Sequence, residues 1–198
     1  QLPRQALVMS EPTMVRRASI ACYRCIDNWN FPASLRRQER NSVCKLLVDA
    51  LLQMAQDSHS SFTPLTSIDG QTEALPVSWT ELECADCLND WPDGRGVYKS
   101  GSGNTSVWVN LVEHVCATTS REDGDMVAAF EEAHDALLSL SRQLALNDHK
   151  FAFSDRLGFL HPEPAKLGTG MSVQVEVHLP SVGTGENAME AALDRLGL

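Results

Sequence analysis

The clearest pattern in the chain is an apolar repeat at spacings of three and four residues, which is typical of one face of an α-helix. The repeat consists of Met126, Phe130, Ala133, Leu137, Leu140 and Leu144. Asp125 precedes it and can cap a helix by accepting a hydrogen bond from a free backbone N–H. We therefore expect a helix over 126–144 whose apolar face lies on a core. About two heptads is too short to favour a coiled coil over ordinary packing.

Three further helices are predicted. The first opens near Ser34, after Pro32, and its apolar positions are Val43, Leu47, Ala50 and Met54. A short helix is expected over 81–88. Asn187 can cap a last amphipathic helix, with apolar positions at Met189, Leu193 and Leu196.

Strands are indicated by alternation and by β-branched residues. Val173, Val175, Val177 and Leu179 alternate with polar residues, which predicts a strand with one buried face that stops at Pro180. The polar run 99–104 reads as the turn of a hairpin between 96–98 and 105–112. Residues 57–78 are expected to be mostly loop. Helices interleaved with hairpin strands favour an α+β fold, an antiparallel sheet flanked by helices.

Charge and composition narrow the function. The 198 residues include 16 Lys and Arg against 26 Asp and Glu, a net charge of −10, which speaks against a nucleic-acid partner. A chain that is 43% hydrophobic and 21% charged is expected to be globular, with one domain as the default and two small domains as the alternative. No apolar run approaches the roughly 18 residues of a membrane span. We expect a cytoplasmic protein, with cytoskeletal association as a narrower expectation, and no membrane partner.

Six cysteines include two Cys-x-x-Cys pairs, Cys22 with Cys25 and Cys84 with Cys87. Paired thiolates with two-residue gaps can hold tetrahedral zinc. The 58 residues from 26 to 83 between the pairs far exceed the usual spacing of about 15 to 20. Free thiols that pack as small apolar groups are the alternative. We expect no metal site.

Several longer motifs occur in a fixed order. Residues 90–96 read D-W-P-D-G-R-G, residues 107–114 read V-W-V-N-L-V-E-H, and residues 157–170 read L-G-F-L-H-P-E-P-A-K-L-G-T-G. Together with the helix opening at 32–51, they cover roughly residues 14–197. They resemble D-W-P-D-A-R-G, V-W-V-N-E-E-D-H and L-G-Y-L-T-C-P-S-N-L-G-T-G of the phosphagen (guanidino) kinases, the creatine kinase and arginine kinase family.

The resemblance implies a glutamine synthetase-like catalytic domain over 14–198 after an N-terminal extension over 1–13. It also implies a truncated chain, because the family's helical substrate lobe precedes this domain and an arginine-bearing segment follows it. Members transfer a phosphoryl group between ATP and a guanidine. That chemistry needs positioned carboxylates and cations around the phosphates.

The motif positions that would carry this chemistry differ here. Leu111 and Val112 stand where the family has two glutamates, and Glu113 stands at the aspartate. Cys116 and Ser172 align with nucleotide-binding arginines, and Glu163 aligns with the reactive cysteine. These six positions are degenerate, and we identify no catalytic residue.

Three positions remain for nucleotide binding. Arg16 and Arg17 lie where the family has an arginine-rich strand, although they can equally form a solvated surface. His114 keeps the motif histidine, with a structural hydrogen-bonding role as the alternative. The turns at 90–96 and 167–170 can be retained because the fold needs them.

We therefore expect a catalytically inactive, phosphagen-kinase-like pseudoenzyme that acts as a structural or regulatory subunit of a larger protein assembly. The alternatives are a guanidino phosphotransferase and a sensor that binds ATP or ADP without turnover. No cofactor is expected, and ATP or ADP with Mg is the ligand that these alternatives would need.

Overall fold

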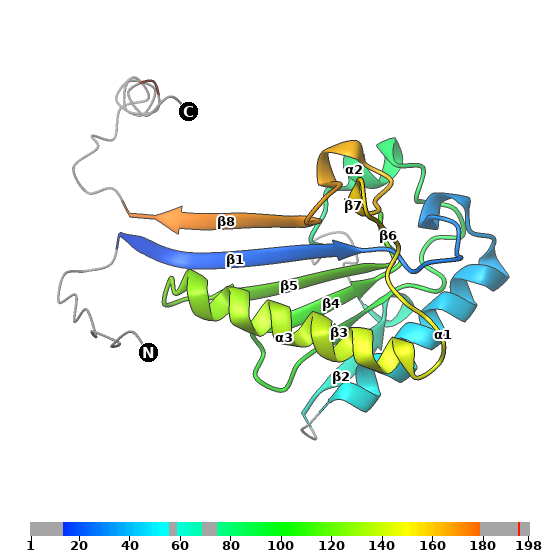
Figure 1. Cartoon of the computed structure of the whole chain (residues 1–198), viewed down its shortest axis with the longest axis horizontal. Coiled ribbons are helices and arrows are strands. Elements are labelled where there is room, and N and C mark those ends of the chain that lie inside the picture. The colour runs from blue at the N-terminus through cyan, green and yellow to red at the C-terminus, as the bar shows by residue number, and fades with distance from the viewer. Residues whose placement is uncertain (1–13, 56–58, 69–74, 179–193, 195–198) are drawn as a thin grey trace.

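A computed structural model describes residues 14–55, 59–68, 75–178 and 194. Within this part of the chain, the fold is built on a six-stranded sheet whose neighbouring strands are all antiparallel (Figure 1). Its order is β2-β3-β4-β5-β1-β8. The strands are β1 (Val15–Arg24), β2 (Ser61–Pro64), β3 (Gly96–Lys99), β4 (Thr105–Val109), β5 (Val115–Arg121) and β8 (Met171–Val177). The expected α+β class is confirmed.

Two long helices, α1 (Arg37–Met54) and α3 (Met126–Ala145), lie on one face of the sheet. Shorter elements complete the domain: α2 (Trp79–Cys84), the hairpin of β6 (Phe153–Ser154) and β7 (Gly158–Phe159), and three 3-10 turns at 32–34, 65–67 and 164–166. Because side chains alternate across a strand, each face of the sheet has its own apolar cluster. The cluster under α1 and α3 includes Ile20, Leu47, Val107, Val109 and Leu140.

The second cluster lies on the opposite face of the sheet. It joins β3, β4 and β5 to α2 and to the connection between β4 and β5. Its buried members are Leu65, Leu82, Cys87, Val97, Trp108, Leu111, Val112 and Cys116. Positions 111, 112 and 116, which we expected to be degenerate, are therefore part of a core.

The long predicted helix is present as α3. The carboxylate of Asp125 accepts a hydrogen bond from the backbone N–H of Ala128 at 3.0 Å, as expected of a cap. Its buried face differs from the prediction, since Met126 and Phe130 are 45% and 48% exposed. The small residues Ala129 and Ala133 are buried instead. They let the first turns of the helix approach the sheet closely, which turns the bulkier side chains aside.

Three element boundaries need correction. The first helix begins at Arg37 rather than near Ser34, because residues 32–34 form a 3-10 turn and the backbone N–H of Arg36 donates to the Glu39 carboxylate at 2.8 Å. The short helix covers 79–84 rather than 81–88. The expected loop over 57–78 contains β2 and a 3-10 turn.

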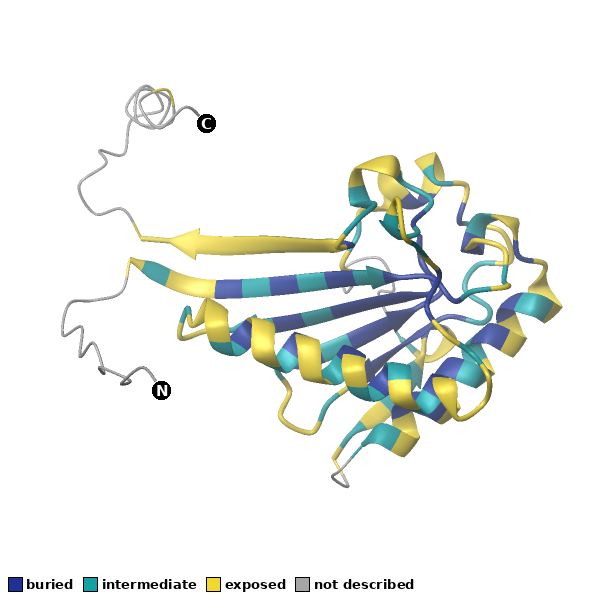
Figure 2. Cartoon of the chain, in the orientation of Figure 1, coloured by how far each residue is buried: buried dark blue, intermediate teal, exposed yellow. Residues whose placement is uncertain are grey.

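The strand predicted over 173–179 is present as β8, but the expectation of a buried face is wrong. All seven residues of β8 are exposed (Figure 2). The reason is that α3 packs on β5 and β1 and does not reach over β8. The predicted last helix, capped by Asn187, lies outside the described residues apart from Asp194.

Candidate functional site

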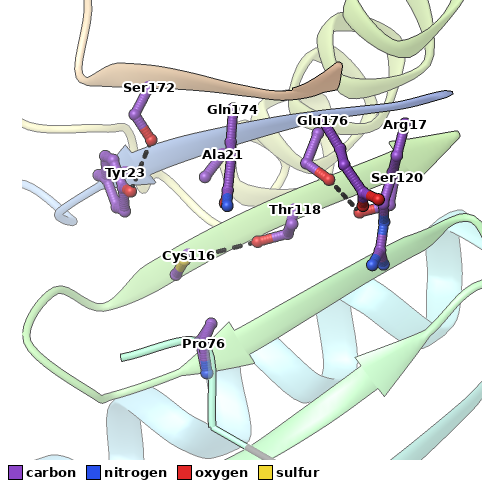
Figure 3. A pocket seen from close by; sticks show the side chains of 11 residues that line it. Arg17, Ala21, Tyr23, Pro76, Cys116, Thr118, Ser120, Ser172, Gln174 and Glu176 are labelled. Carbon is purple, nitrogen blue, oxygen red and sulfur yellow. Dashed lines mark hydrogen bonds between the residues drawn. The ribbon is translucent and has the colours of Figure 1, made fainter. Parts of the chain in front are cut away.

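A polar pocket of about 330 Å³ lies on the face of the sheet opposite α1 and α3. Figure 3 shows side chains from β1, β5 and β8 directed into one space. Their order follows from the register, since Ser19 pairs with Ser120 on one side and with Gln174 on the other. The lining residues are Arg17, Ser19, Ala21, Tyr23, Pro76, Cys116, Thr118, Ser120, Ser172, Gln174 and Glu176.

Hydroxyl groups dominate the pocket. The Tyr23 hydroxyl and the Ser172 hydroxyl are 2.8 Å apart (Figure 3). Those of Ser19 and Ser120 are 2.7 Å apart. Burial raises the pKa of Tyr23, so this group is a neutral donor and acceptor at pH 7. Such a surface can hydrogen-bond a polar ligand but carries little positive charge.

The sequence-predicted cations lie at the far end of this pocket. Arg17 is the one cationic residue that lines it among the described residues, and the guanidinium Nε is 3.1 Å from the Glu122 carboxylate. Arg16 is exposed and borders a shallow hollow shared with Glu122, Asp123 and Glu176. The positive charges of Arg16 and Arg17 are therefore balanced by neighbouring carboxylates.

At the other end, Glu113 is completely buried. The Oε2 atom lies 3.1 Å from Nε2 of His161, and no hydrogen-bond partner is found for Oε1. Nδ1 of His161 accepts a hydrogen bond from the backbone N–H of Glu163 at 2.9 Å. The imidazole proton is therefore assigned to Nε2, which donates to Glu113. The His161 ring meets the Tyr23 ring edge to face at 5.7 Å, so this buried pair lies behind the pocket wall.

Glu163 faces a different partner. The carboxylate lies 3.1 Å from Nζ of Lys166, and that ammonium also lies 4.6 Å from the centre of the Tyr23 ring. Hydrogen bonding to Glu163 raises the pKa of Lys166 although partial burial opposes it. Position 163 thus carries a carboxylate, and this carboxylate is paired with Lys166.

Leu111 and Val112 do not face the pocket. Both belong to the second apolar cluster, with exposed fractions of 0% and 1%. Cys116 borders both the cluster and the pocket, and burial raises the pKa of the thiol far above its ordinary value. These side chains can supply neither a carboxylate nor a thiolate at neutral pH.

His114 serves the fold. It is fully buried, Nδ1 accepts from the backbone N–H of Ile26 at 2.9 Å, and Nε2 lies 3.0 Å from the carbonyl oxygen of Asn30. Both ring nitrogens are therefore occupied by the chain that follows β1. Burial lowers the pKa of His114 to about 4, so the ring is neutral at pH 7.

The turn at 90–96 is held by two buried arginines. The Arg95 guanidinium donates to four backbone carbonyls, among them that of Cys87 at 2.6 Å. Arg40 reaches from α1 to the Asp90 carboxylate at 3.1 Å. The Asn110 side-chain amide donates to the carbonyls of Arg40 and Gly94. The sequence of this turn therefore has a structural explanation in this chain.

The four paired cysteines do not form one group. Cys22 and Cys25 are buried, Cys87 is buried in the second cluster, and Cys84 is exposed on α2. Among the described residues, no three His, Cys, Asp or Glu side chains are placed to hold a metal ion. No helix in this part of the chain is long and apolar enough to cross a membrane.

Sequence reasoning did not find the Glu113–His161 pair. The two residues are 48 positions apart and no spacing rule connects them. The buried roles of Arg40 and Arg95 were also missed, since a basic residue in a helix or turn is usually solvated. Only the tight-turn sequence around Arg95 indicated a structural constraint.

The antiparallel sheet, the helices on one face and the polar pocket on the other define the class of the domain. A crystal structure of lombricine kinase superposes with a TM-score of 0.80 at 23% sequence identity, over 91% of this chain and 52% of that one. A duplicated taurocyamine kinase from Schistosoma mansoni, with bound transition state analog components, gives a TM-score of 0.77 at 24% identity over 91% of this chain and 26% of that one. Both likenesses show the guanidino kinase catalytic-domain fold.

Residues 42–198 match the family model of the ATP:guanido phosphotransferase C-terminal catalytic domain. The chain belongs to this family. A flagellar creatine kinase of Strongylocentrotus purpuratus is 29% identical over 95% of this chain and 17% of its own length. A lombricine kinase of Eisenia fetida is 28% identical over 85% of this chain and 48% of its own. The chain thus spans about half the length of such relatives, or less.

Proposed function

We propose that this chain is a catalytically inactive member of the guanidino kinase family that acts as a structural or regulatory subunit of a protein assembly. The observation that carries the proposal is the burial of Leu111 and Val112 in the second apolar cluster. These are the motif positions at which the family resemblance implies glutamates. An aliphatic side chain can neither orient a guanidinium nor accept its proton, and losing a positioned base costs about 10² to 10⁴ in rate.

The charge of the pocket supports the same proposal. A triphosphate needs several converging cations, whereas within the part of the chain that the structure describes Arg17 is the one cation that lines the pocket, and it is paired with Glu122. Ser172 and Cys116 place a hydroxyl and a protonated thiol where the resemblance implies arginines. The proposal therefore includes no bound cofactor.

Because the proposal includes neither catalysis nor a bound cofactor, the chain would act through contacts with other proteins. The exposed apolar residues on α3 and β8 support it, because large apolar patches often mark contact surfaces. An intracellular location, with cytoskeletal association as its narrower form, belongs to the same proposal. The flagellar name of one relative is in keeping with it.

The direct experiment is a coupled phosphotransfer assay with ATP and creatine, arginine or lombricine. We expect no turnover above a heat-denatured control. The double variant L111E/V112E is the matched test of the motif. It is expected to stay inactive and to lose stability, because two carboxylates would enter an apolar cluster without partners. Turnover by the unmodified chain would refute the proposal.

Thermal melting with and without Mg-ATP tests the sensor alternative separately. A ligand at 100 times its Kd raises the free energy of unfolding by about 2.7 kcal/mol. We expect no shift. A shift that Arg17→Ala abolishes, in a chain that remains inactive, would replace the subunit proposal with a nucleotide sensor.

A further inference from the structure

A second cavity, of about 390 Å³, lies beside the C-terminal half of α3. Because side chains alternate along a strand, Tyr23 at the end of β1 lines the polar pocket, whereas Arg24 faces the helix side of the sheet. The chain after β1 pairs Ile26 with Phe151, which brings the segment after α3 next to Arg24. We call this cavity the α3 groove; it is bounded by Arg24, residues 134–141, residues 150–151 and Phe159.

The walls of the α3 groove are largely apolar. Leu137 and Leu138 reach it from α3, and Phe151 and Phe159 reach it from the opposite side. Leu137 and Phe151 are buried, whereas Leu138 is 39% exposed. The groove thus offers aliphatic and aromatic surface that is open to a ligand from solvent.

Arg24 lies in this apolar setting with part of its hydrogen-bonding capacity unused. The residue is 8% exposed, and the centre of its guanidinium lies 3.6 Å from the centre of the Phe159 ring. Nη1 donates to the backbone carbonyls of Tyr23, Thr169 and Gly170 at 2.7, 3.0 and 3.0 Å. Within the described part of the chain, Nε and Nη2 have no hydrogen-bond acceptor. These two nitrogens form one edge of the guanidinium plane.

The charge of Arg24 is also without a counter-charge. Among the residues that the structure describes, no carboxylate pairs with Arg24, and no Asp or Glu lines the α3 groove. Burial lowers the pKa of Arg24, but a guanidinium stays protonated at neutral pH. Lys150 adds a second cation to the groove, and its own partner is Asp27 at 3.4 Å. In a chain with a net charge of −10, this groove is locally positive.

We propose that the α3 groove binds a small apolar monocarboxylate, of the class of medium-chain fatty acids. The planar carboxylate would take both hydrogen bonds of the free Nε–Nη2 edge of Arg24, and the hydrocarbon would lie against Leu138 and Phe151. Buried charges are usually paired, so an anion satisfies what the described chain leaves open. The volume lies near the lower end of small-molecule sites, about 300–1,000 Å³, which favours a small ligand over a folded partner.

A carboxylate fits this groove better than a phosphate. A phosphate carries more charge and more acceptor oxygens, whereas the groove offers one free guanidinium edge between apolar walls. The groove is separated by the sheet from the polar pocket described above. The inference therefore does not depend on whether the chain is catalytically inactive.

Calorimetric titration of the full 198-residue chain with octanoate, below its critical micelle concentration, tests the site. We expect one octanoate per chain. Three probes dissect the chemistry: 1-octanol keeps the hydrocarbon without the charge, acetate keeps the charge without the hydrocarbon, and inorganic phosphate replaces the carboxylate. Each should bind at least about 10-fold more weakly, since each lacks one of the two contacts. Absence of octanoate binding, or equal binding of octanoate and any of these probes, would overturn the proposal.

Variants on α3 locate the site without disturbing the hydrogen bonds of Arg24 to the backbone. Ser141 lines the groove and is half-buried. Ser141→Asp brings a carboxylate into the groove, so octanoate should bind about 10-fold more weakly or not at all. Ser141→Asn is the neutral control of similar size and should bind octanoate as the unmodified chain does. Arg142→Gln removes an exposed cation outside the groove and should also leave binding unchanged. Unchanged binding in Ser141→Asp, or equal losses in all three variants, would overturn the assignment.

Discussion

Nε2 of His161 donates a hydrogen bond to Oε2 of Glu113 over 3.1 Å, at a place where both side chains are almost completely excluded from solvent. This pair joins the segment after β7 to the connection between β4 and β5. Among the described residues, the imidazole is the partner of Oε2, and the buried Cys116 thiol also lies beside this carboxyl group.

Removing His161 should therefore be costly. His161→Ala leaves a buried acid without its donor, and breaking such a pair costs about 3–5 kcal/mol. Urea denaturation should show this loss. Glu113→Gln is the control, since an amide oxygen still accepts from Nε2 and the decrease should be smaller. Equal losses in both variants would contradict this assignment of the pair.

Stability should fall between pH 6.5 and pH 4 because of His114. Burial lowers the pKa of this histidine to about 4, below the ordinary value of about 6.5. In that window the unfolded chain binds a proton that the folded chain does not. The free energy of unfolding therefore rises with pH, by about 3 kcal/mol from this group.

Denaturation at several pH values, with His114→Gln, checks this contribution. The variant should be less stable at pH 7 and should show a shallower dependence on pH below 6.5. The same substitution at His178, which is exposed beyond β8, controls for a surface histidine. An unchanged slope in His114→Gln would contradict the prediction.

One thiol per native chain should react quickly with Ellman's reagent at pH 7. Cys84 is exposed, whereas burial raises the pKa of Cys25 to about 12 and those of Cys44 and Cys87 to about 11. The thiolate is the reactive form. Cys84→Ser should abolish the fast phase. A fast phase that grows on adding a zinc chelator would instead indicate a zinc site at the Cys-x-x-Cys pairs.

The two parts of the α3 repeat should respond differently to a charge. Leu137 is 9% exposed and packs in the core, while Phe130 is 48% exposed. Leu137→Asp removes about 2–5 kcal/mol of packing and buries an unpaired carboxylate, so we expect loss of the folded state. Phe130→Asp should change stability by about 0.5 kcal/mol. Circular dichroism during thermal melting compares them; similar melting curves would contradict the observed burial.

The sequence predicted elements better than their surroundings. The repeat from Met126 to Leu144 and the alternation after Met171 indicated a helix and a strand, and both are present. Periodicity identifies the apolar face of an element, but it does not say which neighbour covers that face. That is why the exposure of Val173 and Phe130 was not foreseen. Local patterns say even less about contacts between distant residues such as Glu113 and His161.

The candidate site was predictable only as far as the motifs extend. They located Leu111, Val112 and Cys116, whose chemistry follows from residue type alone. The pocket itself depends on β1 lying between β5 and β8, an order that no local sequence signal specifies. His114 illustrates the limit, because the same residue type could bind a ligand or join two segments until its partners are known.

The position of β1 also sets an order of events during translation. This strand is made first among the described elements, yet it pairs with β5 across Ala18 and Arg121 and with β8 across Val15 and Val177. A ribosome that has synthesised the first half of the chain has produced β1 without either neighbour. β1 stays without either neighbour, and accessible to chaperones, until its partners emerge from the exit tunnel: Val115 lies 91 positions after its partner Arg24, and Val177 lies 162 positions after its partner Val15.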